Sequence, residues 1–265
     1  MNKGDDKMSK KTDRIGEKGI NKFGSKMIIT KYIDNKHIDV YFPEYNWTFE
    51  HTRYDHFKDG KIKCPYEPRV YGVGYLGEGK YKVRENGKIT DEYNIWYNML
   101  QRCYYPKSQE RYPTYKGCKV EGYLLNFQNM GKWINENYYE IPGERIHLDK
   151  DILYKGNKIY SRETCIFVPE RINTLFVKCD STRGKNPIGV SLRASGNYGV
   201  WCCNGYGKNI PLGTYLTKEE AFNVYKNYKE KVIKEVIDSY EGKIPEPFYS
   251  RLKEAMYNYE VEIDD

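Results

Sequence analysis

The chain has 265 residues, of which 39% are hydrophobic and 31% charged, and it carries 44 Lys and Arg against 37 Asp and Glu. This composition indicates a folded, soluble chain, and no apolar run approaches the ~20 residues that a membrane-spanning helix requires. The seven cysteines form no CxxC pair, which argues against a disulfide framework or a Cys/His zinc site and favours a reducing, cytoplasmic setting. The net charge of +7 and the 28 tyrosines suit a phosphate-bearing partner with bases to stack on, although AT-rich coding explains the same composition.

The N-terminal part is predicted to form a polar tail followed by a small β-rich module. Residues 1–22 lack the apolar core of a signal peptide, and their composition predicts a disordered tail. Residues 23–88 alternate turns with the short β-like runs KMIITKYI, HIDVYF and GKYKV. Because short alternating runs bounded by turn residues are typical of strands, we expect 23–88 to be an all-β module.

A glycine-rich stretch in this module, VYGVGYLGEGKYKV (70–83), has the GxGxxG spacing of a nucleotide-binding loop. A dinucleotide fingerprint needs a helix directly after its glycines, whereas a strand-like run and the hairpin signal Asn86-Gly87 follow here. The VAIK-like, HRD and DFG motifs of a kinase are missing as well. We therefore interpret the glycines as turns and a close backbone approach between two small β elements, and expect no nucleotide cofactor.

Residues 89–178 are predicted to combine helices with a ββα unit. The apolar residues of DEYNIWYNMLQRC (91–103) and YLLNFQNMGKWINENY (123–138) recur at helical spacing, so two amphipathic helices are expected. Residues 144–168 are predicted to form a β-hairpin around the turn YKGNK, and a short helix is expected from Pro169 onward.

The C-terminal segment 179–265 is predicted to place three strands before a long helix. Its polar start is expected to be a linker, and Thr217 and Glu220 form a capping box where the helix begins. The three strands are expected at 188–194, 197–203 and 209–216. The chain is therefore predicted to be an α+β protein, with an N-terminal β module, a central ββα unit with preceding helices, and a C-terminal three-stranded antiparallel sheet packed on a long helix.

The segment 187–230 contains PIGVSLRASGNYGVWCC and NIPLGTYLTKEEAFNVYKNYKE and resembles the DNA-binding domain of plant ethylene-response factors, which recurs in phage and mobile-element endonucleases. The resemblance rests on Gly189, Val190, Arg193, Leu212, Gly213, Thr214, Thr217, Glu220, Ala221 and Tyr225. It implies a sheet that enters the major groove of double-stranded DNA, with the helix behind it.

In that arrangement Arg193 and Trp201 face the DNA, because Arg reads guanine edges and Trp packs on sugars or methyl groups. Further DNA-contacting candidates are Arg183, Lys185, Tyr198 and Lys208. Ser191 stands where the plant domains carry another base-contacting arginine, so their sequence preference does not transfer. A sheet-plus-helix scaffold for protein contacts is the alternative.

The blocks YNIWYNMLQRCYYP, YPTYKGCKVEGYLLNFQNMGKW and LDKDILYKGNKIYSRETCIFVPERIN look like consecutive blocks of phage HNH-type endonucleases. This resemblance implies a ββα unit that holds Mg²⁺ (or Mn²⁺) against the scissile phosphate while a histidine deprotonates a water. Asp149 falls at the carboxylate position, Asp151 is a second candidate, Asn157 lies in the turn, and Asn173 on the helix is the second candidate ligand.

The sequence departs from the HNH pattern at two places. Lys150 follows Asp149 where the pattern has His, and Thr164-Cys165 replaces Asn-Cys. A lysine serves as general base near pH 7 only if its pKa falls strongly. His147 shares a strand face with Asp149 and is the replacement candidate, with a half-buried structural histidine as the alternative. Arg145 and Lys150 are expected to bind phosphate whether or not cleavage occurs.

These features favour a Mg²⁺-dependent DNA endonuclease of the homing kind, encoded by a phage or mobile element and acting in the cytoplasm of a bacterial host. A catalytically inactive DNA-binding protein on a degenerate nuclease scaffold is the first alternative. A phage effector that binds a host protein through the N-terminal module is the second. The neighbourhood from Asp149 to Asp151 separates the enzyme from the inactive scaffold.

Overall fold

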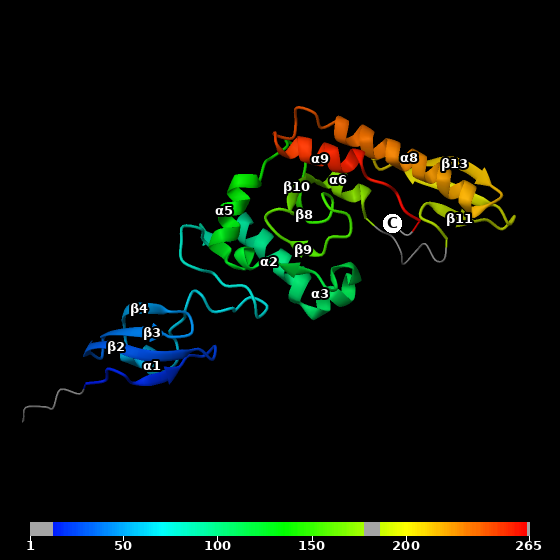
Figure 1. Ribbon diagram of the computed structural model, residues 1–265. Helices are drawn as coiled ribbons and strands as arrows, with labels where there is room; N and C mark the ends of the chain where they lie inside the picture. Colours follow the sequence, from blue (N-terminus) through cyan, green and yellow to red (C-terminus); the bar gives the residue numbers. More distant parts are fainter. Residues whose placement is uncertain (1–12, 178–185, 264–265) are drawn as a thin grey trace, which may run out of the picture. The chain divides into compact units, whose positions relative to one another are not determined.

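A computed structural model describes residues 13–177 and 186–263 and shows a mixed α+β protein (Figure 1). The chain divides into two compact units. Unit 1 comprises Met1–Tyr105 with Leu125–Met130, and unit 2 comprises Pro106–Leu124 with Gly131–Asp265. The helix expected to open the central unit therefore belongs to unit 1, with the β module.

The N-terminal module is a four-stranded antiparallel sheet in the order β1-β2-β3-β4. Its elements are β1 (Lys18–Ile20), β2 (Lys26–Asp34), β3 (His37–Phe42), β4 (Trp47–Thr52) and the short helix α1 (Tyr54–Lys58). The alternation of β2 and β3 buries Met27, Ile29, Val40 and Phe42 against Phe57 of α1. The sheet begins inside the predicted tail, so the prediction of disorder is wrong for 18–20, while residues 1–12 lie outside the described residues.

The glycine-rich stretch is packed against helices and is not a strand. The predicted strand 79–83 is wrong, and the hairpin lies just beyond it, with β5 (Arg84–Glu85) and β6 (Lys88–Ile89) joined by Asn86-Gly87, both at positive φ. A Cβ at Gly74 would lie 2.3 Å from a Leu100 side-chain atom. The glycines thus do permit a close backbone approach, but the neighbour is a helix rather than a second β element.

Two helical regions follow, and the second is split. The helix α2 (Asp91–Tyr104) is capped by Thr90, whose side chain accepts a hydrogen bond from the Tyr93 amide. The single helix expected at 123–138 is instead α4 (Gly122–Leu125) and α5 (Phe127–Asn137), a correction caused by Asn126. The Tyr75 backbone inserts at this break by bonding the Leu125 carbonyl and the Phe127 amide, and the Asn126 side chain caps α5 through the Gln128 amide.

Unit 2 contains the predicted ββα order. The strands β8 (Ile146–Asp149) and β10 (Ile166–Pro169) pair antiparallel, and α6 (Glu170–Leu175) follows directly. The hairpin is less regular than expected, because part of its second arm forms β9 (Ile159–Tyr160), which pairs parallel with β7 (Lys119–Val120). The helix α3 (Pro106–Arg111) and the 3-10 turn η1 (Pro113–Tyr115) precede β7.

The C-terminal part follows the prediction closely. The strands β11 (Val190–Leu192), β12 (Tyr198–Cys203) and β13 (Asn209–Tyr215) form one antiparallel sheet in sequence order, and α8 (Lys218–Asp238) packs on it. The Thr217 side chain caps α8 through the Glu220 amide, 3.2 Å away. A further helix, α9 (Phe248–Tyr257), packs against α8 and has no counterpart in the sequence-based prediction.

Candidate functional site

The ββα unit brings His147 and Asp149 to one face of β8. In the register of the strand pair, Asp149 lies opposite Ile166 and His147 opposite Val168. Side chains two residues apart on a strand point to the same side, as expected from the sequence. The helix α6 packs against both strands, and the side chain of its first residue, Glu170, lies near His147.

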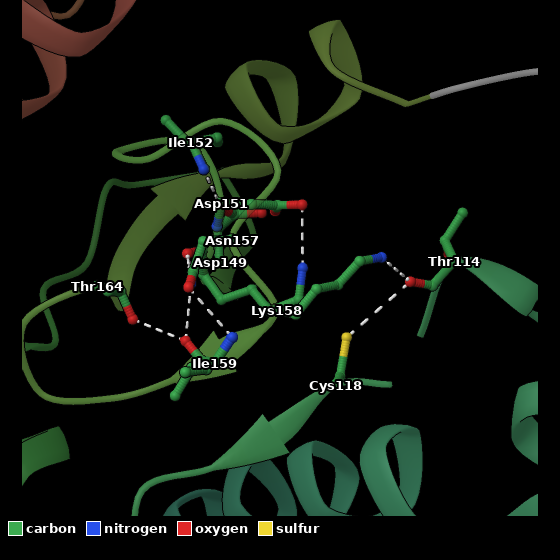
Figure 2. A network of polar contacts seen from close by, with 10 residues as sticks. Thr114, Cys118, Asp149, Asp151, Ile152, Asn157, Lys158, Ile159 and Thr164 are labelled. Atoms are coloured by element: carbon green, nitrogen blue, oxygen red, sulfur yellow. Dashed lines mark hydrogen bonds and ion pairs between the residues drawn. The ribbon is translucent and has the colours of Figure 1, made fainter. Parts of the chain in front are cut away.

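Asp149 is a desolvated carboxylate with one oxygen already engaged. Its Oδ1 accepts hydrogen bonds from the backbone amides of Asp151 and Ile152, each at 2.8 Å (Figure 2). Burial and the neighbouring Asp151 carboxylate raise the pKa of Asp149 to about 6, although the two amides oppose the shift. Because burial still outweighs the two amides and the Lys150 charge, the ionised carboxylate would gain from a further cation nearby.

The positive charge of Lys150 is paired with the Asp151 carboxylate and not with that of Asp149. Its Nζ lies 2.9 Å from Asp151 Oδ2 and 5.8 Å from the centre of the Tyr160 ring, and the residue is only 5% exposed. Burial acts to lower the pKa of Lys150, but the Asp151 carboxylate outweighs it, so this pKa is raised. Lys150 therefore stays protonated, which excludes it as a general base, and its burial argues against the predicted phosphate contact.

His147 faces a glutamate that sequence reasoning missed. Its Nε2 is enclosed without a hydrogen-bond partner in the described part of the chain and lies 4.0 Å from Glu170 Oε1. Asn173 stands one turn after Glu170 on α6 and therefore on the same side of that helix. The spacing of Glu170 and Asn173 is the only signal in the sequence that could have found this glutamate.

The candidate ligands suit magnesium better than a metal ion that needs three or more protein side chains. No group of three His, Cys, Asp or Glu side chains within the described residues could hold a metal ion. Magnesium is commonly held by one or two carboxylates and keeps several waters, so the oxygens of Asp149 and Asn173 are chemically suitable ligands. Asp151 is less suitable, because its carboxylate is paired with Lys150.

The loop between β8 and β10 is held by hydrogen bonds from side chains rather than by the backbone hydrogen bonds of a regular hairpin. Asn157 Nδ2 donates to the carbonyls of Lys150 and Ile159, at 2.6 and 2.7 Å, and Thr164 Oγ1 donates to the same Ile159 carbonyl (Figure 2). Lys158 Nζ also donates to the Thr114 carbonyl at 2.7 Å. Asn157 and Thr164 thus hold the loop that directly follows Asp149, and both residues have a structural role.

The C-terminal sheet has an open face opposite α8. A Cβ at Gly199 would lie 2.4 Å from Arg193 Nε, so the Arg193 side chain lies directly across Gly199. Trp201, two residues further along β12, is 44% exposed on the same face. Cross-strand pairing adds the remaining members of this open face, which are Ser191, Cys203, Asn209, Pro211 and Thr214.

The other predicted DNA-contacting residues divide into three groups. Tyr198 points toward the helix side, where Lys218 Nζ of α8 lies 6.0 Å from its ring centre. It therefore does not join Arg193 and Trp201 on the open face, and its prediction as a DNA contact is corrected. Lys208 in the β12–β13 loop and Arg145 before β8 are exposed. Arg183 and Lys185 lie outside the described residues.

Arg171 joins the ββα unit to the C-terminal sheet. From α6, its Nε donates to the Gly205 carbonyl at 2.7 Å, and its guanidinium lies 3.6 Å from the centre of the Tyr206 ring. It also donates to Ser239 Oγ, just after α8. Since Gly205 and Tyr206 belong to the β12–β13 loop, the two candidate sites share one packed body.

Comparison with protein-family models, with characterised proteins and with solved structures gives no match to this chain. The two resemblances therefore stay predictions that rest on the residues quoted for them. Among the described helices, none is both long and apolar enough to cross a membrane.

Proposed function

We propose that the chain binds double-stranded DNA through the open face of β11, β12 and β13. The observation that carries the proposal is Arg193 lying across Gly199 beside the exposed Trp201. Arginine donates two hydrogen bonds to a guanine edge in the major groove, and a β-ribbon is narrow enough to enter that groove. A side chain at position 199 would displace Arg193 from this placement.

The test is a fluorescence anisotropy titration of the full chain with duplex DNA at several salt concentrations, followed by selection of a preferred site. Affinity should fall steeply with salt, because phosphate contacts release counterions. Arg193→Ala should cost about 1–3 kcal/mol on the preferred site and little on other sequences. Lys231→Ala removes one exposed positive charge from α8 and serves as the matched control. Equal loss for both variants on all sequences would contradict base reading by Arg193.

The second candidate function is Mg²⁺-dependent cleavage of a DNA phosphodiester at the ββα unit. The specific observation in its favour is the desolvated carboxylate of Asp149 on the same strand face as His147. A bound magnesium ion would supply a Lewis acid and lower the pKa of a coordinated water. Asp149 would hold the ion, His147 would accept a proton from the attacking water, and the exposed Arg145 would bind a phosphate.

The ion pair of Lys150 with Asp151 supports the inactive scaffold instead, because it neutralises one candidate carboxylate. A nicking assay with and without Mg²⁺ separates the two readings. Asp149→Ala should abolish nicking and leave DNA binding unchanged, since it removes the metal ligand but no phosphate contact. Normal DNA binding without metal-dependent nicking on any substrate would leave the protein as a DNA-binding protein on a nuclease-like scaffold.

A further inference from the structure

The tip of the β1–β2 hairpin in unit 1 presents a phenylalanine to solvent between positive charges. Phe23 is 51% exposed, and its neighbours Asn21 and Ser25 are both buried. The Arg69 guanidinium lies 5.1 Å and Lys63 Nζ 5.9 Å from the centre of the Phe23 ring. Both distances are within the range at which a cation is attracted to an aromatic face.

The turn that carries Phe23 is fixed by the side chain of Asn21. Its Oδ1 accepts hydrogen bonds from the amides of Phe23 and Ser25, at 3.0 and 2.9 Å. Its Nδ2 donates to the Ile62 carbonyl and to Glu67 Oε1. The hairpin tip is therefore tied to the segment after α1, and Phe23 has little freedom to fold back onto the sheet.

Glu67 completes a closed ring of contacts. It is only 1% exposed, and its Oε2 is buried without a hydrogen-bond partner among the described residues, 3.8 Å from Arg69 Nε. The contacts thus run from Phe23 to Asn21, from Asn21 to Glu67, from Glu67 to Arg69, and from Arg69 back to the Phe23 ring. A buried carboxylate of this kind holds the guanidinium over the ring before any ligand arrives.

The charge at this tip is positive. Lys22 and Lys63 are exposed and make no ion pair within the described part of the chain, and Arg69 is balanced only by Glu67. A π surface and positive charge at one place suit a nucleotide, because the base stacks on the ring and the phosphate meets the cations. Inside a duplex the faces of the bases are covered by their neighbours, so only an unpaired base can stack in this way.

We infer that the Phe23 tip, defined by Lys22, Phe23, Lys63 and Arg69, binds single-stranded DNA by stacking an unpaired base. The inference rests on the proposed function in taking DNA as the partner, but it uses a different surface and a different form of DNA. The protein would then contact duplex DNA through its C-terminal sheet and an opened or single strand through its N-terminal module.

The experiment measures anisotropy of a labelled oligothymidine of roughly 12 nucleotides with the full chain. Phe23→Ala should weaken binding about 5- to 150-fold, the effect of removing one stacked base, while Phe23→Trp should retain it. Phe49→Ala is the matched control, because Phe49 is a second exposed phenylalanine of the same sheet, 37% exposed, and it packs edge-on against Trp47. Circular dichroism checks that each variant is folded.

The measurements distinguish failure of the Phe23 tip from failure of the C-terminal sheet. Unchanged single-strand binding in Phe23→Ala, equal loss in Phe49→Ala, or tighter binding of an RNA oligonucleotide of the same sequence would overturn the inference. The duplex titration of the Arg193 variant reports on the proposed function independently. Duplex binding that persists in Phe23→Ala while single-strand binding is lost would support both.

Discussion

The open face of the C-terminal sheet and the ββα unit handle their charged side chains in opposite ways. Arg193 lies on the surface of the sheet and makes no ion pair within the described residues. Lys150 is buried and has its charge balanced by Asp151 at 2.9 Å. The positive charge of Arg193 is therefore free to meet a polyanion, whereas the positive charge of Lys150 is already neutralised by Asp151.

This difference shows what the sheet would need for the proposed DNA binding and what the ββα unit would need for the proposed cleavage. In the proposed binding mode, a DNA duplex would meet Arg193 and Trp201 as they stand, since both are exposed on one face. The ββα unit holds a carboxylate whose pKa is raised by burial, and it needs an added cation before that carboxylate is stabilised. In the proposed functions, DNA binding would need only the exposed side chains of the sheet, whereas cleavage would also need a metal ion at Asp149.

The largest expected effect concerns His147, the proposed proton acceptor of the ββα unit. If His147 accepts the proton of the attacking water, His147→Ala should slow Mg²⁺-dependent nicking about 10²- to 10⁴-fold and leave DNA affinity unchanged. Single-turnover nicking rates measure this effect, with His56→Ala on the exposed surface of α1 as the control. A change below about threefold would make His147 a structural histidine held beside Glu170.

A pair of glycines tests how tightly the sheet is packed on α8. Gly189 and Gly196 both have positive φ, at 72° and 86°, but a Cβ at Gly189 would lie 2.0 Å from the Tyr225 ring and one at Gly196 would meet nothing. Gly196→Ala should destabilise by about 1–2 kcal/mol from backbone strain alone. Gly189→Ala adds overpacking and should cost about 2–5 kcal/mol in total. Urea unfolding of both variants checks the difference, and equal losses would mean that Tyr225 moves aside freely.

The C-terminal sheet was predictable because all its local signals agree. The strands alternate, turn residues separate them, and Thr217 with Glu220 marks the start of α8, so no single element had to be inferred from tertiary contacts. Tyr198 is the exception among the predicted DNA-contacting residues of β12: it lies three positions before Trp201, so the alternation of the strand places it on the side of α8.

Outside the C-terminal sheet, the wrong predictions concern features that depend on contacts between residues far apart in the sequence. The break at Asn126 depends on the Tyr75 backbone, about fifty residues away, and the glycines of 70–83 take their shape from α2 and the turn at Asn126. Within the site, the approach of Glu170 to His147 and the burial of Lys150 beside Tyr160 of β9 are likewise contacts between separate elements. A sequence shows which charges are present but not which of them neutralise each other.

An effect smaller than the largest loss expected for Gly189→Ala tests the desolvated carboxylate itself, in metal-free buffer. The folded-state pKa of Asp149, about 6, lies above the unfolded value near 3.9, so the native state holds this proton more tightly. Stability from the group is therefore present below about pH 4 and lost as pH rises toward 6. Asp149→Asn keeps an oxygen for the Asp151 and Ile152 amides but carries no charge. It should be more stable than wild type by about 2–3 kcal/mol at pH 8 and equal to it at pH 4, as measured by urea unfolding.

Addition of Mg²⁺ at pH 8 turns the same variant into a test of metal binding that needs no activity. If Asp149 holds the ion, Mg²⁺ should stabilise the wild type and not Asp149→Asn, because a ligand that binds only the native state raises its stability by mass action. The gap between the two proteins should then shrink as Mg²⁺ is titrated. A gap that stays constant at all Mg²⁺ concentrations would show that the ββα unit does not capture the ion, and would leave DNA binding by the sheet as the function that the structure supports. A wild type as stable as Asp149→Asn at pH 8 without metal would show that the Asp149 carboxylate is solvated in the folded protein. It would then remove the argument that the ββα unit gains stability from an added cation.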